Sequence, residues 1–310
     1  DKYFEIFNDI IYDRLDLISG LFGEYTYKSG EYFVIVAGFR GDYHNNSNIH
    51  YTPRMNIKYN PTDQTAIRVS SGRAFRIPHV LVDYASFLAS NRQISIGILD
   101  PEVAWNYGIN IIHCFKLLSR EGTVNFDLYR TDFDNQIVMD IETQGKLSFY
   151  NLEGKSYARS IQIDLSYEIF KRFDLKMAWK RNDVIQTFDG LEKIAPLTPK
   201  YRALFNIAYA NNLHTWMFDV TANYIGESRL PTHELLEKYY SESFYLYNAQ
   251  ITKKFKYFDL YLGGENLLNY VQENPILNAS NPDSDTFDAS LIYAPIHGCM
   301  IYLGFRYKIN

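Results

Sequence analysis

Strict alternation of apolar and polar residues is the feature of this sequence that most limits its fold. In "IQIDLSY", residues 161–167, every second side chain is apolar and the ones between are polar. The segments "FDLKMAWK" (173–180), "FDVTANY" (218–224) and "IYLGFRYKI" (301–309) show the same pattern. A period of two residues is that of a β-strand with two unlike faces. No helical pattern of comparable strength competes, so the sequence predicts an all-β fold.

The alternating segments are longer than the strands of a typical soluble protein. A globular strand averages about 5–6 residues, whereas a tilted strand that crosses a bilayer needs about 9–11. We expect thirteen strands, near residues 18–28, 31–42, 50–59, 64–72, 103–118, 123–133, 155–169, 173–187, 200–210, 215–226, 241–253, 257–267 and 296–309. Their length alone is also compatible with a large soluble sandwich.

The connections between these strands alternate between short and long. The tight turns are 29–30, 60–63, 119–122, 170–172, 211–214 and 255–257. The long segments are 73–102, 134–154, 188–199, 227–240 and 268–295, with a shorter one at 42–50. Short turns at one rim and long loops at the other are typical of an antiparallel up-and-down transmembrane β-barrel. We therefore predict such a barrel, with its apolar face toward lipid; a secreted all-β domain is the alternative.

Composition agrees with this prediction and excludes other classes. The chain contains 27 Tyr and 21 Phe, and many of them lie near expected strand ends, as in interfacial aromatic girdles. The net charge of -5 gives no reason to expect a nucleic-acid partner. No segment approaches the roughly 18 apolar residues of a membrane helix. The first residues do not have the pattern of a signal peptide.

The strand number raises the question of whether the barrel is complete. Bacterial single-chain barrels normally have an even number of strands. Either residues 1–7 supply a fourteenth strand or more barrel precedes them. We favour the second interpretation, because the lumen face carries many charges and no segment resembles a plug. Residues 1–310 are then the C-terminal portion of a barrel of about 22 strands, the size class whose lumen is occluded by an internal domain.

Four motifs in a fixed order carry a family resemblance. They are "SGRAFRIP" (71–78), "LDPEVAWNYG" (99–108), "YRTDFDNQIV" (129–138) and "GGENLLNYVQ" (263–272), followed by the ending "YLGFRYKIN". Together they span nearly the whole chain, which resembles the C-terminal barrel of TonB-dependent outer-membrane receptors, most of all those of Bacteroidetes-type bacteria. The family usually ends on an aromatic residue, whereas three further residues follow Tyr307 here.

The resemblance implies an integral receptor of a Gram-negative outer membrane that takes up a scarce nutrient. Its partners would be outer-membrane lipid, the ligand and the TonB complex, which contacts an upstream plug and box that nothing in this chain matches. The implied ligands are iron siderophores, cobalamin or similar chelates, with glycans as a second option. A passive porin-like channel is the alternative. We expect no enzyme activity and no cofactor, since the chain lacks GxSxG, HExxH and P-loop motifs.

Candidate ligand contacts lie in the longest predicted loop. Arg73 and Arg76 can be interpreted as binding an anionic chelate or a phosphate-bearing ligand. The preferred interpretation is that they pair with carboxylates such as Asp100 and Glu102 and fix the loop. Gly72 is expected to let the preceding strand end, and Pro78 denies a continuing ladder its N–H group.

His79 and Asn135, which also lie in predicted loops, complete the set of candidate ligand contacts. His44 and His50 flank the short outer loop. Because a metal site needs convergent ligands at short spacing, we expect these histidines to be solvated and predict no resident metal.

Overall fold

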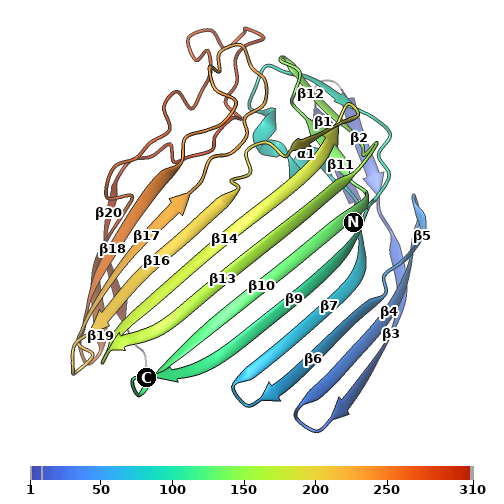
Figure 1. The fold of residues 1–310 in the computed structure, drawn as a ribbon. Coiled ribbons are helices and arrows are strands. Elements are labelled where there is room, and N and C mark those ends of the chain that lie inside the picture. Colours follow the sequence, from blue (N-terminus) through green and yellow to red (C-terminus); the bar gives the residue numbers. More distant parts are fainter. Residues whose placement is uncertain (1, 8–9, 308–310) are drawn as a thin grey trace.

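One large curved sheet with a cap of loops at one end makes up the computed structural model, which describes residues 2–7 and 10–307 (Figure 1). Each strand is antiparallel to its neighbours, and spatial order follows chain order. The strands along the sheet are β3 (Ile18–Ser29), β4 (Phe33–His44), β6 (Arg54–Thr62), β7 (Thr65–Arg76), β9 (Glu102–Leu117), β10 (Arg120–Asn135), β13 (Ser156–Phe170), β14 (Phe173–Phe188), β16 (Tyr201–Ala210), β17 (Trp216–Ile225), β18 (Phe244–Lys254), β19 (Phe258–Glu265) and β20 (Met300–Tyr307).

All thirteen predicted strands are confirmed, although several boundaries differ: the strand predicted at 50–59 begins at Arg54, and the one predicted at 296–309 begins at Met300, while positions 308–309 lie outside the described residues. The most instructive error concerns the end of one strand. The strand β7 does not end at Gly72. Gly72 pairs with Asn106, and the ladder continues until Arg76 pairs with Glu102. An extended backbone accepts glycine without interruption, whereas Pro78 has no N–H group to continue a ladder. The proline therefore ends this strand and the glycine does not.

Tight turns join the strands at the lower end of the sheet, and the long connections lie at the upper end (Figure 1). The turn between β9 and β10 consists of Leu118 and Ser119, whose φ angles are 49° and 62°. Two consecutive residues with positive φ match the type I′ turn, whose twist suits a two-residue hairpin. The alternation of short and long connections is thus confirmed.

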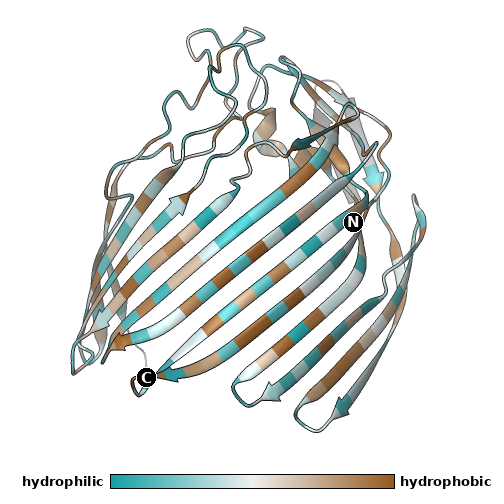
Figure 2. Cartoon of the chain, viewed as in Figure 1, coloured by the Kyte–Doolittle hydropathy of each residue, from teal (hydrophilic) through white to brown (hydrophobic). Residues whose placement is uncertain are grey.

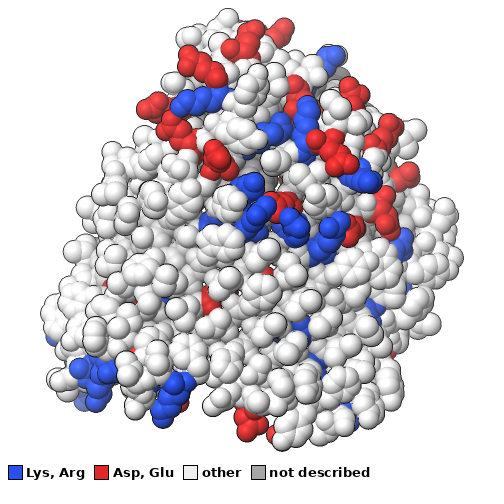
Figure 3. Space-filling model, viewed as in Figure 1, with Lys and Arg blue, Asp and Glu red and all other residues white. Residues whose placement is uncertain are grey.

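The two faces of the sheet differ as the alternation predicts. One row of directly opposed residues consists of Tyr59, Ile67, Ile111, Phe126, Ile163 and Trp179. A row on the opposite face consists of Arg68, Asn110, Asp127, Gln162, Lys180 and Arg202. The convex face carries few charges over the middle of the strands (Figure 3), and hydropathy alternates along each ribbon (Figure 2). The apolar rows therefore face outward, where Ile163 is 44% exposed, and the polar rows face a lumen.

Short elements surround this sheet. The strand β1 (Lys2–Phe7) pairs with β2 (Ile10–Leu15) as a separate two-stranded sheet, so in the described residues it adds no strand to the main sheet. The short strand β5 (Asn48–Tyr51) pairs antiparallel with β4, and β15 (Leu191–Ile194) pairs antiparallel with β14. No helix in the described part of the chain is long and apolar enough to cross a membrane.

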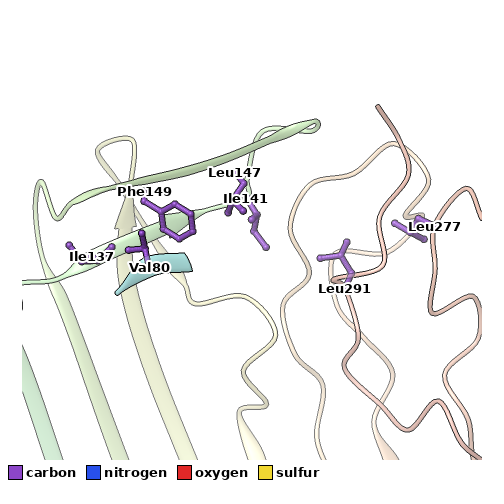
Figure 4. Close-up of a cluster of buried hydrophobic side chains, with 7 residues drawn as sticks. All are labelled: Val80, Ile137, Ile141, Leu147, Phe149, Leu277 and Leu291. Atoms are coloured by element: carbon purple, nitrogen blue, oxygen red, sulfur yellow. The ribbon is translucent and has the colours of Figure 1, made fainter. Parts of the chain in front are cut away.

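The cap is a small structure in its own right and was not predicted. It contains α1 (Val80–Asp83), a short 3₁₀ helix (Ala85–Leu88), and the strands β8 (Gln93–Ile96), β11 (Ile137–Asp140) and β12 (Lys146–Asn151). Its buried apolar side chains (Figure 4) are Val80, Ile137, Ile141, Leu147, Phe149, Leu277 and Leu291. Burial of each larger side chain contributes about 1.5–3 kcal/mol. The long loops are therefore held together at one end of the lumen.

Candidate functional site

A pocket of about 690 Å³ lies on the lumen side of the sheet, beneath the cap. Its floor and wall come from β13, β14, β16, β17 and β18, and its roof from the loop segments around Leu197 and 292–295. Because β16 begins, β17 ends and β18 begins at the cap side, the pocket lies near the outer end of the lumen. A volume of this size fits a small-molecule ligand.

Two cations stand side by side in this pocket. Lys180 of β14 and Arg202 of β16 are directly opposed in the ladder, and both side chains line the pocket. Within the described residues, neither side chain has a hydrogen bond or an ion pair. Like charges directly opposite each other destabilise a sheet. An anion between them would offset this repulsion, so the pair is a candidate anion-binding site.

The remaining pocket wall is mostly apolar. Phe244 is 5% exposed and stacks on Tyr270 with ring centroids 4.7 Å apart. The roof segment is held by Gln272, whose amide oxygen accepts hydrogen bonds from the backbone N–H groups of Tyr293 (2.8 Å) and Ala294 (3.1 Å). The pocket thus combines an apolar surface with two cations, an arrangement suited to an anionic ligand with an apolar or aromatic shell.

Buried ion pairs fix the cap above this pocket. Arg92 pairs with Asp288, and their side chains are 5% and 2% exposed. Glu142 pairs with Arg229 at 2.6 Å and with Lys193 at 3.1 Å. Burial by itself raises the pKa of Glu142, but the hydrogen bonds and charges of these two cations outweigh it and hold that pKa below its ordinary value. These contacts link loops that lie far apart in the sequence.

Along the same lumen face, the strands β7, β9, β10 and β13 carry a network of amides and carboxylates. Asn110 donates to Asn125 (2.7 Å) and to Asp127 (2.8 Å), and Asn125 donates to Asp164 (3.1 Å). Arg68 donates to Asn110 at 2.9 Å. The amides satisfy these carboxylates from one strand to the next, so this part of the wall is polar and ordered.

The candidate residues Arg73 and Arg76 lie outside the pocket. Arg76 pairs with Glu102 at 2.6 Å and with Asp83 at 3.2 Å. Arg73 donates to the Tyr51 carbonyl at 2.8 Å and lines a separate pocket of about 530 Å³. The expected partner Glu102 is therefore present, whereas the backbone groups of Asp100 bond with the Asn151 side chain.

His79 and Asn135 also have partners within the protein. Arg14 lies 3.1 Å from Nδ1 of His79, and Asn135 donates to the Pro101 carbonyl at 2.9 Å. The expectation that His44 is solvated is wrong, because its side chain is 2% exposed and its Nε2 lies 3.1 Å from Asp16. Among the described residues, no cluster of three or more His, Cys, Asp or Glu side chains could hold a metal ion.

Sequence reasoning missed Lys180 and Arg202. Lys180 stands at the polar end of the segment 173–180, and Arg202 is the second residue of β16, the next strand of the sheet. Nothing in the sequence says that these two positions are opposed, because a shift of one residue in the register would separate them. The order of strands gave the only signal, since β14 and β16 were expected to be neighbours.

Comparison with protein families matches residues 7–267 to the family described as TonB dependent receptor-like, β-barrel. No curated protein sequence matches the chain. Solved structures with a similar fold include a variant of the ferric enterobactin receptor of Pseudomonas aeruginosa, with 13% identity, a TM-score of 0.68 and coverage of 96% of this chain and 45% of that one.

Two further structures resemble the chain to the same degree. The siderophore receptor PirA of Acinetobacter baumannii has 13% identity and a TM-score of 0.63, with coverage of 94% of this chain and 46% of that one. The ferric-catecholate import receptor Fiu of E. coli K12 has 13% identity and a TM-score of 0.65, with coverage of 94% and 45%. The chain therefore spans less than half the length of these structures, and the likeness shows a shared fold.

Proposed function

The chain belongs to the TonB-dependent receptor family of integral outer-membrane proteins in Gram-negative bacteria, and from this premise we propose that it takes up an anionic nutrient chelate through the pocket beneath its cap. The family members are transporters and not enzymes. The proposed ligand is an iron siderophore or a similar chelate, and the proposed energy source is the TonB complex.

The opposed cations Lys180 and Arg202 are the observation that carries this proposal. They favour a negatively charged ligand over an uncharged one, and the apolar wall favours one with an aromatic or apolar shell. Three of the structures with a similar fold are described as receptors for siderophores or ferric chelates. Cobalamin and glycans lack a comparable negative charge, so they would gain less binding free energy from these two cations.

We further propose that residues 1–310 form the C-terminal portion of the receptor barrel, with the plug and the first strands upstream. The strands β3 and β20 are the two edges of the sheet, and no described ladder joins them. Unpaired backbone groups cost several kcal/mol each in a bilayer, so further strands are needed to close the barrel. Arg73, Arg76, His79 and Asn135 stay candidate ligand contacts, although their partners support a role in fixing loops.

Uptake by the intact receptor tests the proposal. A strain that lacks the gene should lose uptake of an anionic chelate from a panel of ferric siderophores that includes ferric enterobactin, and should keep uptake of cobalamin and a neutral glycan. A protonophore should abolish the same uptake in the parent strain, because the energy comes from the proton gradient. The proposal fails if deletion leaves the uptake of every anionic chelate unchanged, or if only uptake of the uncharged nutrients is lost.

The pocket is tested separately with the double variant Lys180→Gln, Arg202→Gln. Loss of two charged hydrogen bonds should weaken binding of the anionic chelate by at least about tenfold. The control is Lys176→Gln, because Lys176 also faces the lumen but is opposed by Asn206 and lies outside the pocket. Equal affinity of the double variant and the control would place the ligand site elsewhere in the receptor.

A further inference from the structure

A cluster of charged side chains interrupts the apolar outward face of the sheet on its cap side. The cluster consists of Arg130 and Asp132 of β10, Arg159 of β13, and Arg181 and Asp183 of β14. Charged atoms gather over the upper halves of these strands, and the surface directly below them shows only scattered charges (Figure 3). We call this set the outer arginine cluster.

The register places the outer arginine cluster on the outward face. Arg130 is directly opposed to Tyr107 on one side and to Arg159 on the other, and Arg159 is opposed to Asp183. Leu128 and Ile161 are also directly opposed, and each lies two residues from the arginine of its own strand, on the side of the short turns. These belong to the apolar rows, because residues two apart along a strand share a face. The cluster therefore lies at the outer border of the apolar band.

The internal ion pairs of the cluster leave positive charge uncompensated. Arg130 pairs with Asp132 at 2.7 Å, while Arg159 and Arg181 share Asp183 at 2.9 and 3.1 Å. Three guanidinium groups and two carboxylates give 3 − 2 = +1. Arg130 and Arg159 are also like charges in directly opposed positions, which destabilises a sheet unless an anion lies between them.

The arginines keep donors free on the outward side. The side chains of Arg130 and Arg159 are 47% and 45% exposed, so their carboxylate partners do not enclose them. Arg130 lies 4.8 Å from the ring centroid of Tyr157, and Arg181 lies 5.9 Å from that of Tyr201. Tyrosine and arginine side chains of this kind anchor a protein at the level of lipid headgroups.

We propose that the outer arginine cluster binds a phosphate group of a phosphorylated glycolipid in the outer leaflet. The guanidinium fork matches the oxygens of a phosphate, and two opposed arginines can donate to one phosphate from both sides. The acyl chains would lie along the apolar rows that contain Leu128, Ile161 and Ile163. The occupant is a membrane lipid and not a free anion, because the site adjoins an outward apolar surface instead of the lumen.

Lipid binding to the purified full-length receptor tests this proposal. The probes are bisphosphorylated lipid A, phosphate-free lipid A and inorganic phosphate, and the readout is retained lipid by native mass spectrometry. The receptor should retain the bisphosphorylated lipid and bind the phosphate-free form at least about tenfold more weakly. Arg159→Gln and Arg130→Gln should each lower retention of the phosphorylated form to a similar degree, and Arg159→Lys, which keeps the charge without the fork, by less.

The matched control is Lys253→Gln. Lys253 lies on the same outward face but near the short turns, where its ammonium group is 4.4 Å from the ring centroid of Trp216. This variant should retain the glycolipid as the parent does. Equal retention of phosphate-free lipid A, unchanged retention in folded Arg159→Gln and Arg130→Gln, or displacement by inorganic phosphate at the lipid's own concentration would each overturn the proposal.

Discussion

Glu142 links three outer connections through one carboxylate, and its ionisation should control the order of the cap. Its pKa is held below the ordinary value of 4.5, because Arg229 and Lys193 outweigh the effect of burial. A lowered pKa stabilises the folded state fully above the ordinary value. That contribution is lost as the pH falls through the lower folded-state pKa. We therefore predict that the cap is intact at neutral pH and loosens below about pH 4.5.

Limited proteolysis of the cap loops between pH 7 and pH 3 measures this effect. At each pH, the cleavage rate is divided by the rate at which the same protease cleaves an unfolded reference substrate. Glu142→Gln should already be more cleavable at pH 7, by the equivalent of about 1–3 kcal/mol, because Arg229 then lacks its charged partner. Its cleavage should also depend less on pH. A parent protein whose cap opens near pH 6, or a variant with the same profile as the parent, contradicts the assignment to Glu142.

Single residues show where sequence reasoning reaches its limit. Arg76 was paired correctly with Glu102, since motifs at the ends of neighbouring strands suggest proximity. His44 was not recognised as buried, because its partner Asp16 comes from the other side of a hairpin and no pattern marks the pair. Lys180 and Arg202 became a site only through the register of β14 and β16. Side-chain partners across strands depend on register, which the sequence does not state.

At the scale of the strand, the assignment of faces predicts opposite outcomes for neighbouring residues. Ile163 lies in the middle of an outward apolar row, and Gln162 faces the lumen directly opposite Asp127. Ile163→Arg should lower the free energy of unfolding by about 2–4 kcal/mol, the effect of a cation near the bilayer midplane. Gln162→Arg should cost much less, because the lumen is polar and the carboxylate of Asp127 on one side offsets the like charge of Lys180 on the other.

The folded fraction, read from heat-modifiable migration in gels, compares the two variants. A folded Ile163→Arg protein together with an unfolded Gln162→Arg protein would reverse the two faces and contradict the register that places both residues.

The elements themselves were predictable in proportion to their length. The thirteen long strands have eight residues or more, enough for a period of two to be read. The cap strands β8, β11 and β12 have four to six residues, too few for a period of two to stand out, so the sequence predicts loops there. The pairing of β12 with β8 is parallel and joins segments about fifty residues apart, so no turn signal announces it. The predicted end of β7 at Gly72 is wrong, because glycine does not break a strand whose ladder continues to Arg76.

At the scale of the whole molecule, the lumen decides between a receptor and a passive channel. Barrels of 16–18 strands leave an aqueous channel, whereas those of about 22 strands carry an internal plug. The same thirteen strands fit both architectures, because the sheet is open between β3 and β20 in the described residues. Lys180 and Arg202 line a pocket beneath a cap that ion pairs hold in place, which suits capture of a ligand better than free diffusion.

Conductance of the full-length protein in a planar bilayer distinguishes the two architectures. We predict a nearly closed protein, because a plug upstream of these residues would fill the lumen. A variant that lacks the upstream region before the first barrel strand should conduct ions, since the polar wall around Asn110 and Asp127 would then border water. Large, steady conductance of the intact protein would contradict the plug and favour the porin-like channel. A closed protein whose truncated form conducts would support the energised receptor, because opening would then require displacement of an internal domain.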